Sequence, residues 1–404
     1  MNFLDDYLAT SWRGWIARLA ILFAVIHVAQ AEPRLWIDNQ GREVRAGFAG
    51  MAEDGETVKL RLDNGNTVPF PIARLSADCQ GHAREMAKRF AARAAEPVFN
   101  FDSDWPQLVG FRDDPEIEII LEDADKGEFI YESMNFRFVS DVRLSRSVVR
   151  GFALLFEATH AFCQAMPIGM GEGNRTEGKY LIMLYEDIAD YHAAGAPTGS
   201  AGVYMMGRSR IKVPLDSLGV RPVGSGYMLD RSVSNRTLSH EIAHQLTPLP
   251  YYGRSRFNSW FIEGIAEYVA STPYRSGQYN TRANRRAAVD YATGFSRVDN
   301  RGRNIGTDIR LSSLEAFMDL PYAQFARSNA NFNYAVGLLL TYYFIHMDGE
   351  GDAANLQAYL RALLDGKSRE EAEAKLLAGR TFAELQDDVQ AAWRRHGVRF
   401  DFGG

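Results

Sequence analysis

The segment Thr237–Leu246 contains two histidines four positions apart, His240 and His244, with Glu241 directly after the first. On an α-helix these histidines lie one turn apart on one face, so both imidazoles can reach the same metal ion. Zinc suits this arrangement because its catalytic sites use three protein ligands and leave a position for water. We therefore expect His240 and His244 to bind Zn2+. Glu241 is expected to be the general base that takes a proton from the zinc-activated water.

Two further acids, Glu263 and Glu267, lie on a second segment with helical periodicity, Trp260–Ala270. Apolar residues occupy the other side of this predicted helix, so periodicity alone favours the polar stripe of an ordinary surface helix. The histidine pair has a comparable alternative, which is an accidental HExxH motif on a solvated helix face. A third ligand is needed to separate a catalytic zinc site from these simpler interpretations.

The combination of HEIAHQ, a gap of eighteen residues after His244 and then WFIEGIAEY resembles the gluzincin metallopeptidases, especially the aminopeptidase N family. The resemblance implies a zincin-like domain in which Glu263 is the third zinc ligand and Glu267 orients a ligand histidine through its second ring nitrogen. The segment Asn331–Leu340 is similar to a helix of that family whose tyrosine stabilises the oxyanion, which makes Tyr334 the candidate. The alternative is that Tyr334 is the first aromatic residue of an ordinary core helix.

One departure from the family pattern concerns the substrate. The aminopeptidases carry a GAMEN strand whose glutamate holds the free amino group of the substrate, whereas the corresponding segment here, Gly199–Met205, contains no acid. We therefore expect an endopeptidase that cleaves a peptide or protein substrate, rather than an aminopeptidase. Two other classes stay open, a non-catalytic zinc-containing binding protein of the envelope and a zinc hydrolase of a non-peptide substrate. Overall the chain is similar to uncharacterised bacterial gluzincin-like proteins.

The elements that must position these residues follow from hydrophobic patterns. Residues 98–235 are expected to form the α/β part of the peptidase domain, and residues 236–404 an almost entirely helical, zinc-binding part. Strands are predicted at Glu116–Leu121, Phe136–Val139, Lys179–Tyr185 and Ile211–Leu215, and an amphipathic helix at Ser145–Ala165. Pro214 suits an edge strand, because proline cannot donate a hydrogen bond to a neighbouring strand. The predicted fold class is α+β, with a mixed sheet and a helical C-terminal lobe.

Residues 32–83 are predicted to form a small β-barrel of short strands, with a tight turn at Asp63–Gly65. The barrel region resembles the Sla homology domain, an SH3-like barrel, through the segments Trp36–Val44, Ala46–Phe48 and Leu75–Asp78. The resemblance implies a structural or docking module that could contact a protein partner. Residues 84–97 are expected to be a helical linker to the peptidase domain.

The N-terminus has the features of an export signal. Arg13 and Arg18 precede the apolar run Leu19–Ile26, and Ala29–Ala31 has the small-x-small pattern of a signal-peptidase site. A membrane anchor is the alternative, but the run is shorter than the roughly 20 residues that span a bilayer. We expect a signal peptide at residues 1–31, a periplasmic or secreted protein, and no stable membrane span after cleavage.

Charge and cysteine content set further bounds. The net charge of -6 and the absence of a block dense in lysine or arginine argue against binding to nucleic acid. In an exported protein Cys79 and Cys163 either pair or stay buried and reduced, and the sequence leaves both open. The basic clusters Arg282–Arg286 and Arg301–Arg303 are expected to lie on a solvated face or in a loop near the mouth of the cleft.

Overall fold

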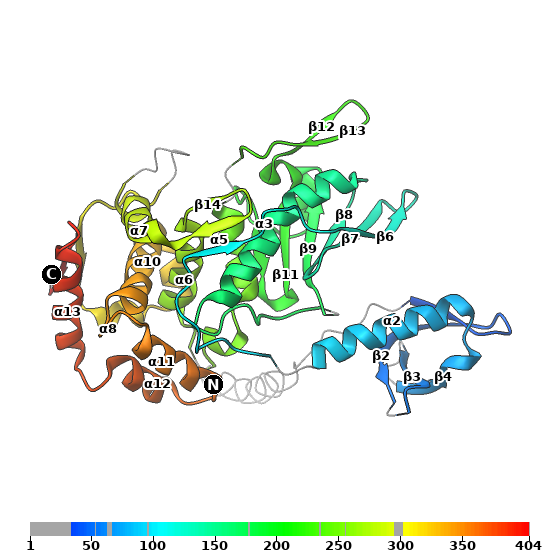
Figure 1. Cartoon of the computed structure of the whole chain (residues 1–404), viewed down its shortest axis with the longest axis horizontal. Coiled ribbons are helices and arrows are strands. Elements are labelled where there is room, and N and C mark those ends of the chain that lie inside the picture. Colours follow the sequence, from blue (N-terminus) through cyan, green and yellow to red (C-terminus); the bar gives the residue numbers. More distant parts are fainter. Residues whose placement is uncertain are drawn as a thin grey trace, which may run out of the picture. The chain divides into compact units, whose positions relative to one another are not determined.

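The computed structural model describes residues 34–52, 54–62, 67–94, 97–176, 178–233, 236–254, 256–294 and 302–403. The chain divides into two compact units, a smaller one that comprises Met1–Ala95 with Thr176–Gly178 and a larger one that comprises Glu96–Arg175 and Lys179–Gly404 (Figure 1). The predicted signal peptide and the Asp63–Gly65 turn lie outside the described residues. Within the described ranges, no helix is long and apolar enough to cross a membrane.

The described residues of the smaller unit form an open antiparallel meander of four strands in chain order, with a helix packed against it. The strands are β1 (Arg34–Ile37), β2 (Glu43–Met51), β3 (Thr57–Leu62) and β4 (Thr67–Pro71), and the helix is α2 (Ala77–Ala94). Cys79, Ala83 and Met86 lie on one face of α2 and complete the core around Trp36 and Phe48. The linker boundary predicted at residue 84 therefore falls inside a helix that belongs to this unit.

In the described part of the larger unit, the main sheet has six strands in the order β10-β11-β9-β8-β7-β6. These strands are β6 (Glu118–Asp123), β7 (Glu128–Glu132), β8 (Phe136–Ser140), β9 (Tyr180–Tyr185), β10 (Val203–Met205) and β11 (Arg210–Pro214). β8, β9 and β11 are parallel, and the other pairs are antiparallel. Helix α3 (Arg146–Ala165) connects β8 to β9 and begins where the Ser145 hydroxyl accepts a hydrogen bond from the Val148 amide.

The predicted strands and the predicted helix of this part correspond to β6, β8, β9, β11 and α3, and each of their ends lies within two residues of the prediction. The edge position predicted for Pro214 is wrong, because β11 lies between β10 and β9. Pro214 is nevertheless tolerated, since β10 pairs only with Arg210–Lys212 and leaves the end of β11 unpaired on that side.

After residue 236 the described chain is mainly helical, as predicted. The helices are α5 (Arg236–Leu246), α6 (Ser259–Ser271), α7 (Asn284–Thr293), α8 (Leu314–Met318), α9 (Tyr322–Arg327), α10 (Ala330–His346), α11 (Ala354–Leu364), α12 (Arg369–Leu377) and α13 (Phe382–Arg394). Short strands that the patterns did not predict also occur in the larger unit. They are β5 (Leu108–Gly110), β12 (Val220–Val223), β13 (Gly226–Leu229), β14 (Tyr274–Arg275), β15 (Gln278–Asn280), β16 (Asp308–Leu311) and β17 (Arg399–Phe402).

Helices α5, α6 and α10 lie next to one another in the interior of the larger unit (Figure 1). Every residue of α6 is buried. The prediction from periodicity alone, a polar stripe of a surface helix at Glu263 and Glu267, is therefore wrong. A carboxylate on a fully buried helix is costly unless it is paired or binds a metal, so these two acids need partners.

Candidate metal site and its surroundings

Helices α5 and α6 bring the side chains of the three predicted ligands close together. His240 Nε2 lies 3.0 Å from His244 Nε2 and 3.3 Å from Glu263 Oε2. His244 Nε2 lies 3.4 Å from the same Glu263 oxygen. Within the described ranges, these three residues are the group whose side chains could together hold a metal ion.

The spacing of the three atoms fits zinc. A tetrahedral metal with bonds of about 2.0–2.1 Å keeps its ligand atoms about 3.3–3.4 Å apart. The distances of 3.0, 3.3 and 3.4 Å are close to that value. Glu263 Oε2 is also buried and makes no hydrogen bond of normal geometry with the described residues. A buried carboxylate oxygen in this position suits a metal ligand better than a structural residue, because a structural residue would be hydrogen-bonded.

Glu267 lies next to His240, one helical turn beyond Glu263. Its Oε1 is 3.0 Å from His240 Nδ1. A proton on Nδ1, next to this carboxylate, would leave the Nε2 lone pair of His240 for a metal. Burial by itself would raise the pKa of Glu267, but the Arg303 guanidinium and the His240 imidazole lower this pKa to about 2. The carboxyl is therefore ionised at neutral pH.

Arg303 lies in the loop between α7 and β16, as one of the two predicted alternatives had it, but it does not lie on a solvated face. Its side chain is only 21% exposed and forms an ion pair with the buried Glu267. Its Nε donates to Glu267 Oε2 over 3.1 Å, and Nη2 donates to Oε1. Arg282, from the other basic cluster, is exposed as predicted and binds Gln107. Arg301 lies outside the described residues.

The predicted base, Glu241, lies next to the edge strand of the main sheet. Its Oε2 accepts a hydrogen bond of 2.7 Å from the Tyr204 amide in β10. The Glu241 carboxylate is therefore not one of the three converging groups. Among the strands that the structure describes, β10 pairs with β11 alone, so its other side is a strand edge that no described strand covers, next to α5. The segment predicted to replace the GAMEN strand, Gly199–Met205, thus contains the edge strand beside the site.

Tyr334 lies at the start of α10, next to the ligands. Its ring stacks at 6.1 Å on the ring of His240. Burial and the nearby Glu263 carboxylate raise the pKa of Tyr334 far above its usual value. The hydroxyl therefore stays protonated and can donate a hydrogen bond. The two alternatives for Tyr334 are compatible, because the ring packs against the core of the larger unit while the phenol faces charged groups of the site.

Two tyrosines near the ligands had no sequence signal. Tyr322 is 43% exposed, yet burial of its hydroxyl and the nearby Glu263 carboxylate raise the pKa of this phenol well above its usual value. The Tyr252 hydroxyl donates to the backbone carbonyl of His244 over 2.7 Å, which holds the end of α5. Both residues lie outside the motif helices, so only the folded chain brings them to the site.

Polar contacts and two glycines hold the motif helices in place. The Tyr279 hydroxyl of β15 donates to Ser239 of α5 over 3.0 Å and also bonds to Thr159 of α3. α6 and α10 approach closely at Gly264 and Gly337, where a Cβ on Gly264 would lie 2.8 Å from the Gly337 carbonyl carbon. This close contact sets the position of Glu263, on α6, relative to Tyr334, on α10.

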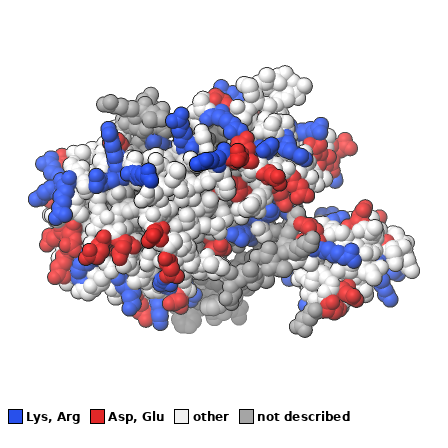
Figure 2. All heavy atoms as spheres, in the orientation of Figure 1, with Lys and Arg blue, Asp and Glu red and all other residues white. Residues whose placement is uncertain are grey.

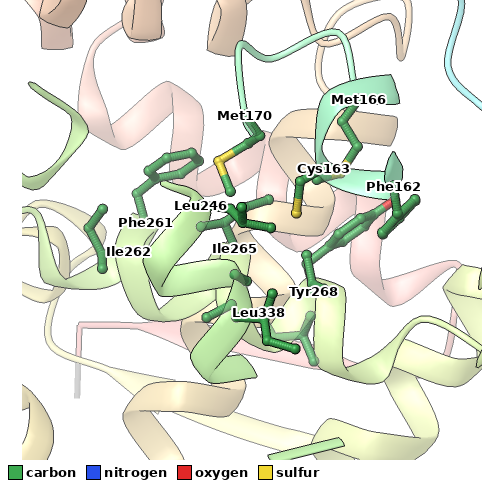
Figure 3. Close-up of a cluster of buried hydrophobic side chains, with 14 of the residues drawn as sticks. Phe162, Cys163, Met166, Met170, Leu246, Phe261, Ile262, Ile265, Tyr268 and Leu338 are labelled. Carbon is green, nitrogen blue, oxygen red and sulfur yellow. The ribbon is translucent and has the colours of Figure 1, made fainter. Parts of the chain in front are cut away.

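The other predicted candidates are dispersed. Cys79 and Cys163 are both free and buried, one in each unit. Figure 3 shows Cys163 among apolar side chains of α3, α5, α6 and α10. His160 is buried beside Phe136, whereas His346 is half-buried, and burial lowers the pKa of His346 to about 4. Lysine, arginine and acidic side chains occur together over the face drawn in Figure 2.

No protein-family model matches the chain, and no characterised protein was found to be similar to it in sequence.

Proposed function

We propose that the chain is a zinc-dependent metallopeptidase of the gluzincin type, with a zincin-like catalytic domain, that cleaves inside peptide chains. The observation that carries this proposal is the convergence of His240 Nε2, His244 Nε2 and Glu263 Oε2 at distances of 3.0 to 3.4 Å. A structural zinc site would use four protein ligands, whereas three ligands leave a position for water. Glu241 stands next to these ligands without being one of them.

Zinc held by these three residues would polarise the scissile carbonyl and lower the pKa of a water molecule. In this proposal Glu241 accepts the proton of the attacking water and passes it to the leaving amine. The protonated hydroxyl of Tyr334 donates a hydrogen bond to the oxyanion that develops on the substrate carbonyl. Glu267 holds His240 in the tautomer whose Nε2 faces the metal.

The surroundings of the site favour an extended substrate. β10 offers an unpaired strand edge next to Glu241, and an extended peptide can bind such an edge through backbone hydrogen bonds. The segment Gly199–Met205 has no carboxylate to hold a free amino terminus. We therefore propose an endopeptidase. The sequence of the smaller unit resembles the SH3-like Sla homology domain, so this unit is proposed to bind a protein partner, and export is proposed from residues 1–31.

The test is substitution of the base. Glu241→Gln is nearly isosteric and cannot accept a proton, so the variant should keep its zinc and lose peptide cleavage. Zinc is measured by elemental analysis, and cleavage is measured on a peptide library with and without a chelator. Cleavage by the variant at the wild-type rate would refute the role of Glu241. A wild-type protein that holds zinc but cleaves no peptide would favour a non-peptide substrate or a binding protein.

A further inference from the structure

We propose that Arg303 is a positioning residue of the candidate metal site, and that its guanidinium orients His240 through Glu267 and at the same time holds Tyr334. This inference rests on the proposed function, because it takes His240 as a metal ligand and Tyr334 as the oxyanion donor. Arg303 belongs to neither motif helix. It lies between α7 and β16, sixty-three residues after His240.

The contacts with Glu267 fix the direction of that carboxylate. Nε and Nη2 of Arg303 donate to different oxygens of Glu267, which is the two-point geometry that a planar guanidinium favours. With both oxygens held in this way, Oε1 is kept 3.0 Å from His240 Nδ1, within ion-pair distance. Rotation of the Glu267 carboxylate would break two bonds to Arg303. The orientation of the imidazole therefore depends on the guanidinium as well as on Glu267.

The third nitrogen of the guanidinium reaches the other side of the site. Nη1 donates to Asn331 Oδ1 over 2.9 Å, and Asn331 precedes Tyr334 by three residues on α10. The centre of the guanidinium lies 4.8 Å from the centroid of the Tyr334 ring. One rigid group thus contacts both α6, through Glu267, and the first turn of α10. A lysine could supply the charge but could not make these contacts together, because its single nitrogen has no planar fork.

The backbone around Arg303 is itself held firmly. The Arg303 amide donates to the Tyr291 carbonyl at the end of α7 over 2.7 Å. Gly302 packs against the backbone of Gly294 and Tyr291 so closely that no Cβ would fit there without a shift. The Tyr291 ring also lies under the guanidinium, 5.9 Å from its centre. Since the backbone is anchored, the guanidinium can act as a fixed reference for Glu267 and Tyr334.

Charge balance agrees with this role. Glu241, Glu263 and Glu267 place three carboxylates around the two histidines. Among the described residues, the structure shows an ion pair between Arg303 and one of these acids, Glu267. One arginine and one divalent cation would together neutralise the three carboxylates. Arg303 therefore completes the metal site without touching the metal.

The experiment measures metal binding rather than activity, in the whole chain, with Co2+ as the probe. Arg303→Lys keeps the charge but loses the fork, and we expect the affinity for Co2+ to fall about 10- to 100-fold and the visible spectrum to change. Glu267→Gln should have a similar effect. The double variant should bind little worse than either single variant, because both residues act through His240. Arg286→Lys, in a side chain that is 89% exposed, is the matched control and should bind Co2+ like the wild type.

Each outcome decides the proposal. A folded Arg303→Lys protein with wild-type affinity and spectrum would overturn it, and so would fully additive effects of the two substitutions. If Arg303→Lys does not fold, Asn331→Ala removes only the α10 side of the contact and should still change the Co2+ spectrum. An unchanged spectrum in that variant would also overturn the proposal. A wild-type protein that binds Co2+ but cleaves no peptide would refute the proposed function alone, whereas failure to bind Co2+ would overturn both.

Discussion

Replacement of Gly264 by alanine tests how the contact between α6 and α10 positions the site. A Cβ at this position would lie 2.8 Å from the Gly337 carbonyl carbon, and still closer to the Gly337 oxygen and to Thr341 Oγ1. Carbon atoms pack best at about 3.5–4.0 Å. The two helices must therefore separate by at least about 0.7 Å, since 3.5 minus 2.8 is 0.7. Backbone atoms cannot rotate out of the way.

The magnitude follows from two opposing terms. Alanine is a better helix former than glycine by about 1 kcal/mol, so the substitution would stabilise an open helix. An extra methyl group in a well-packed interior costs about 1–3 kcal/mol. The steric term should exceed the gain in helix propensity, because the atoms in contact belong to the backbone of α10. With a steric cost in the upper part of that range, about 2–3 kcal/mol, and a gain of about 1 kcal/mol, we expect the free energy of unfolding to fall by about 1–2 kcal/mol.

The consequence for activity is larger. Glu263 directly precedes Gly264, and Tyr334 is one turn before Gly337, so a shift between the helices moves the proposed metal ligand away from the proposed oxyanion donor. Misplacement by about 1 Å can cost about 100-fold in rate. We expect kcat to fall by at least about tenfold, with a smaller change in KM. Steady-state kinetics on a cleaved peptide measure this.

The control is Gly81→Ala, because Gly81 is also inside a helix, α2, and a Cβ there would meet nothing within 4 Å. Urea denaturation should show that this variant is about 0.5–1 kcal/mol more stable than the wild type. The steric reasoning fails if Gly264→Ala is as stable as the wild type and equally active, or if both alanine variants change stability in the same direction.

Three further predictions concern removal of the metal, the oxyanion donor Tyr334 and stability at acidic pH. Removal of the metal with a chelator should lower Tm by several degrees, and zinc should restore it, because a ligand at 100 times its Kd stabilises the fold by about 2.7 kcal/mol; an unchanged Tm would contradict a tightly bound metal at Glu263. Tyr334→Phe should lower kcat about 100- to 1,000-fold and leave KM nearly unchanged, whereas a change in KM alone would indicate a role in substrate binding. Burial lowers the pKa of His346 to about 4 in the folded state, so the unfolded chain binds the proton first as the pH falls below about 6.5. This residue should therefore make unfolding easier by about 1.4 kcal/mol per pH unit between about pH 6.5 and 4. Urea denaturation at several pH values should show that His346→Gln loses less stability than the wild type as the pH falls. An equal loss in both proteins would refute the lowered pKa of His346.

Local patterns predicted the elements well and their environments poorly. Alternation and helical periodicity depend on neighbours along the chain, so they located β6, β8, β9, β11 and the helix α3 within two residues. The same patterns made α6 a surface helix, although every residue of it is buried. Periodicity reports one apolar face and cannot show that α10 and other elements also cover the polar one. Pro214 was misjudged for a similar reason, since the order of strands in a sheet is not a local property.

The sequence by itself determined that His240 and His244 share a helix face, because a spacing of four residues has that result in any α-helix. Family resemblance then selected Glu263. Only the tertiary structure decided that Glu263 Oε2 meets both imidazoles and that the half-buried Arg303 forms an ion pair with Glu267. The physical reason is the range of the interactions involved. Spacing on one helix follows from backbone geometry, whereas convergence of α5, α6, α10 and the segment around Arg303 depends on how buried surfaces pack together.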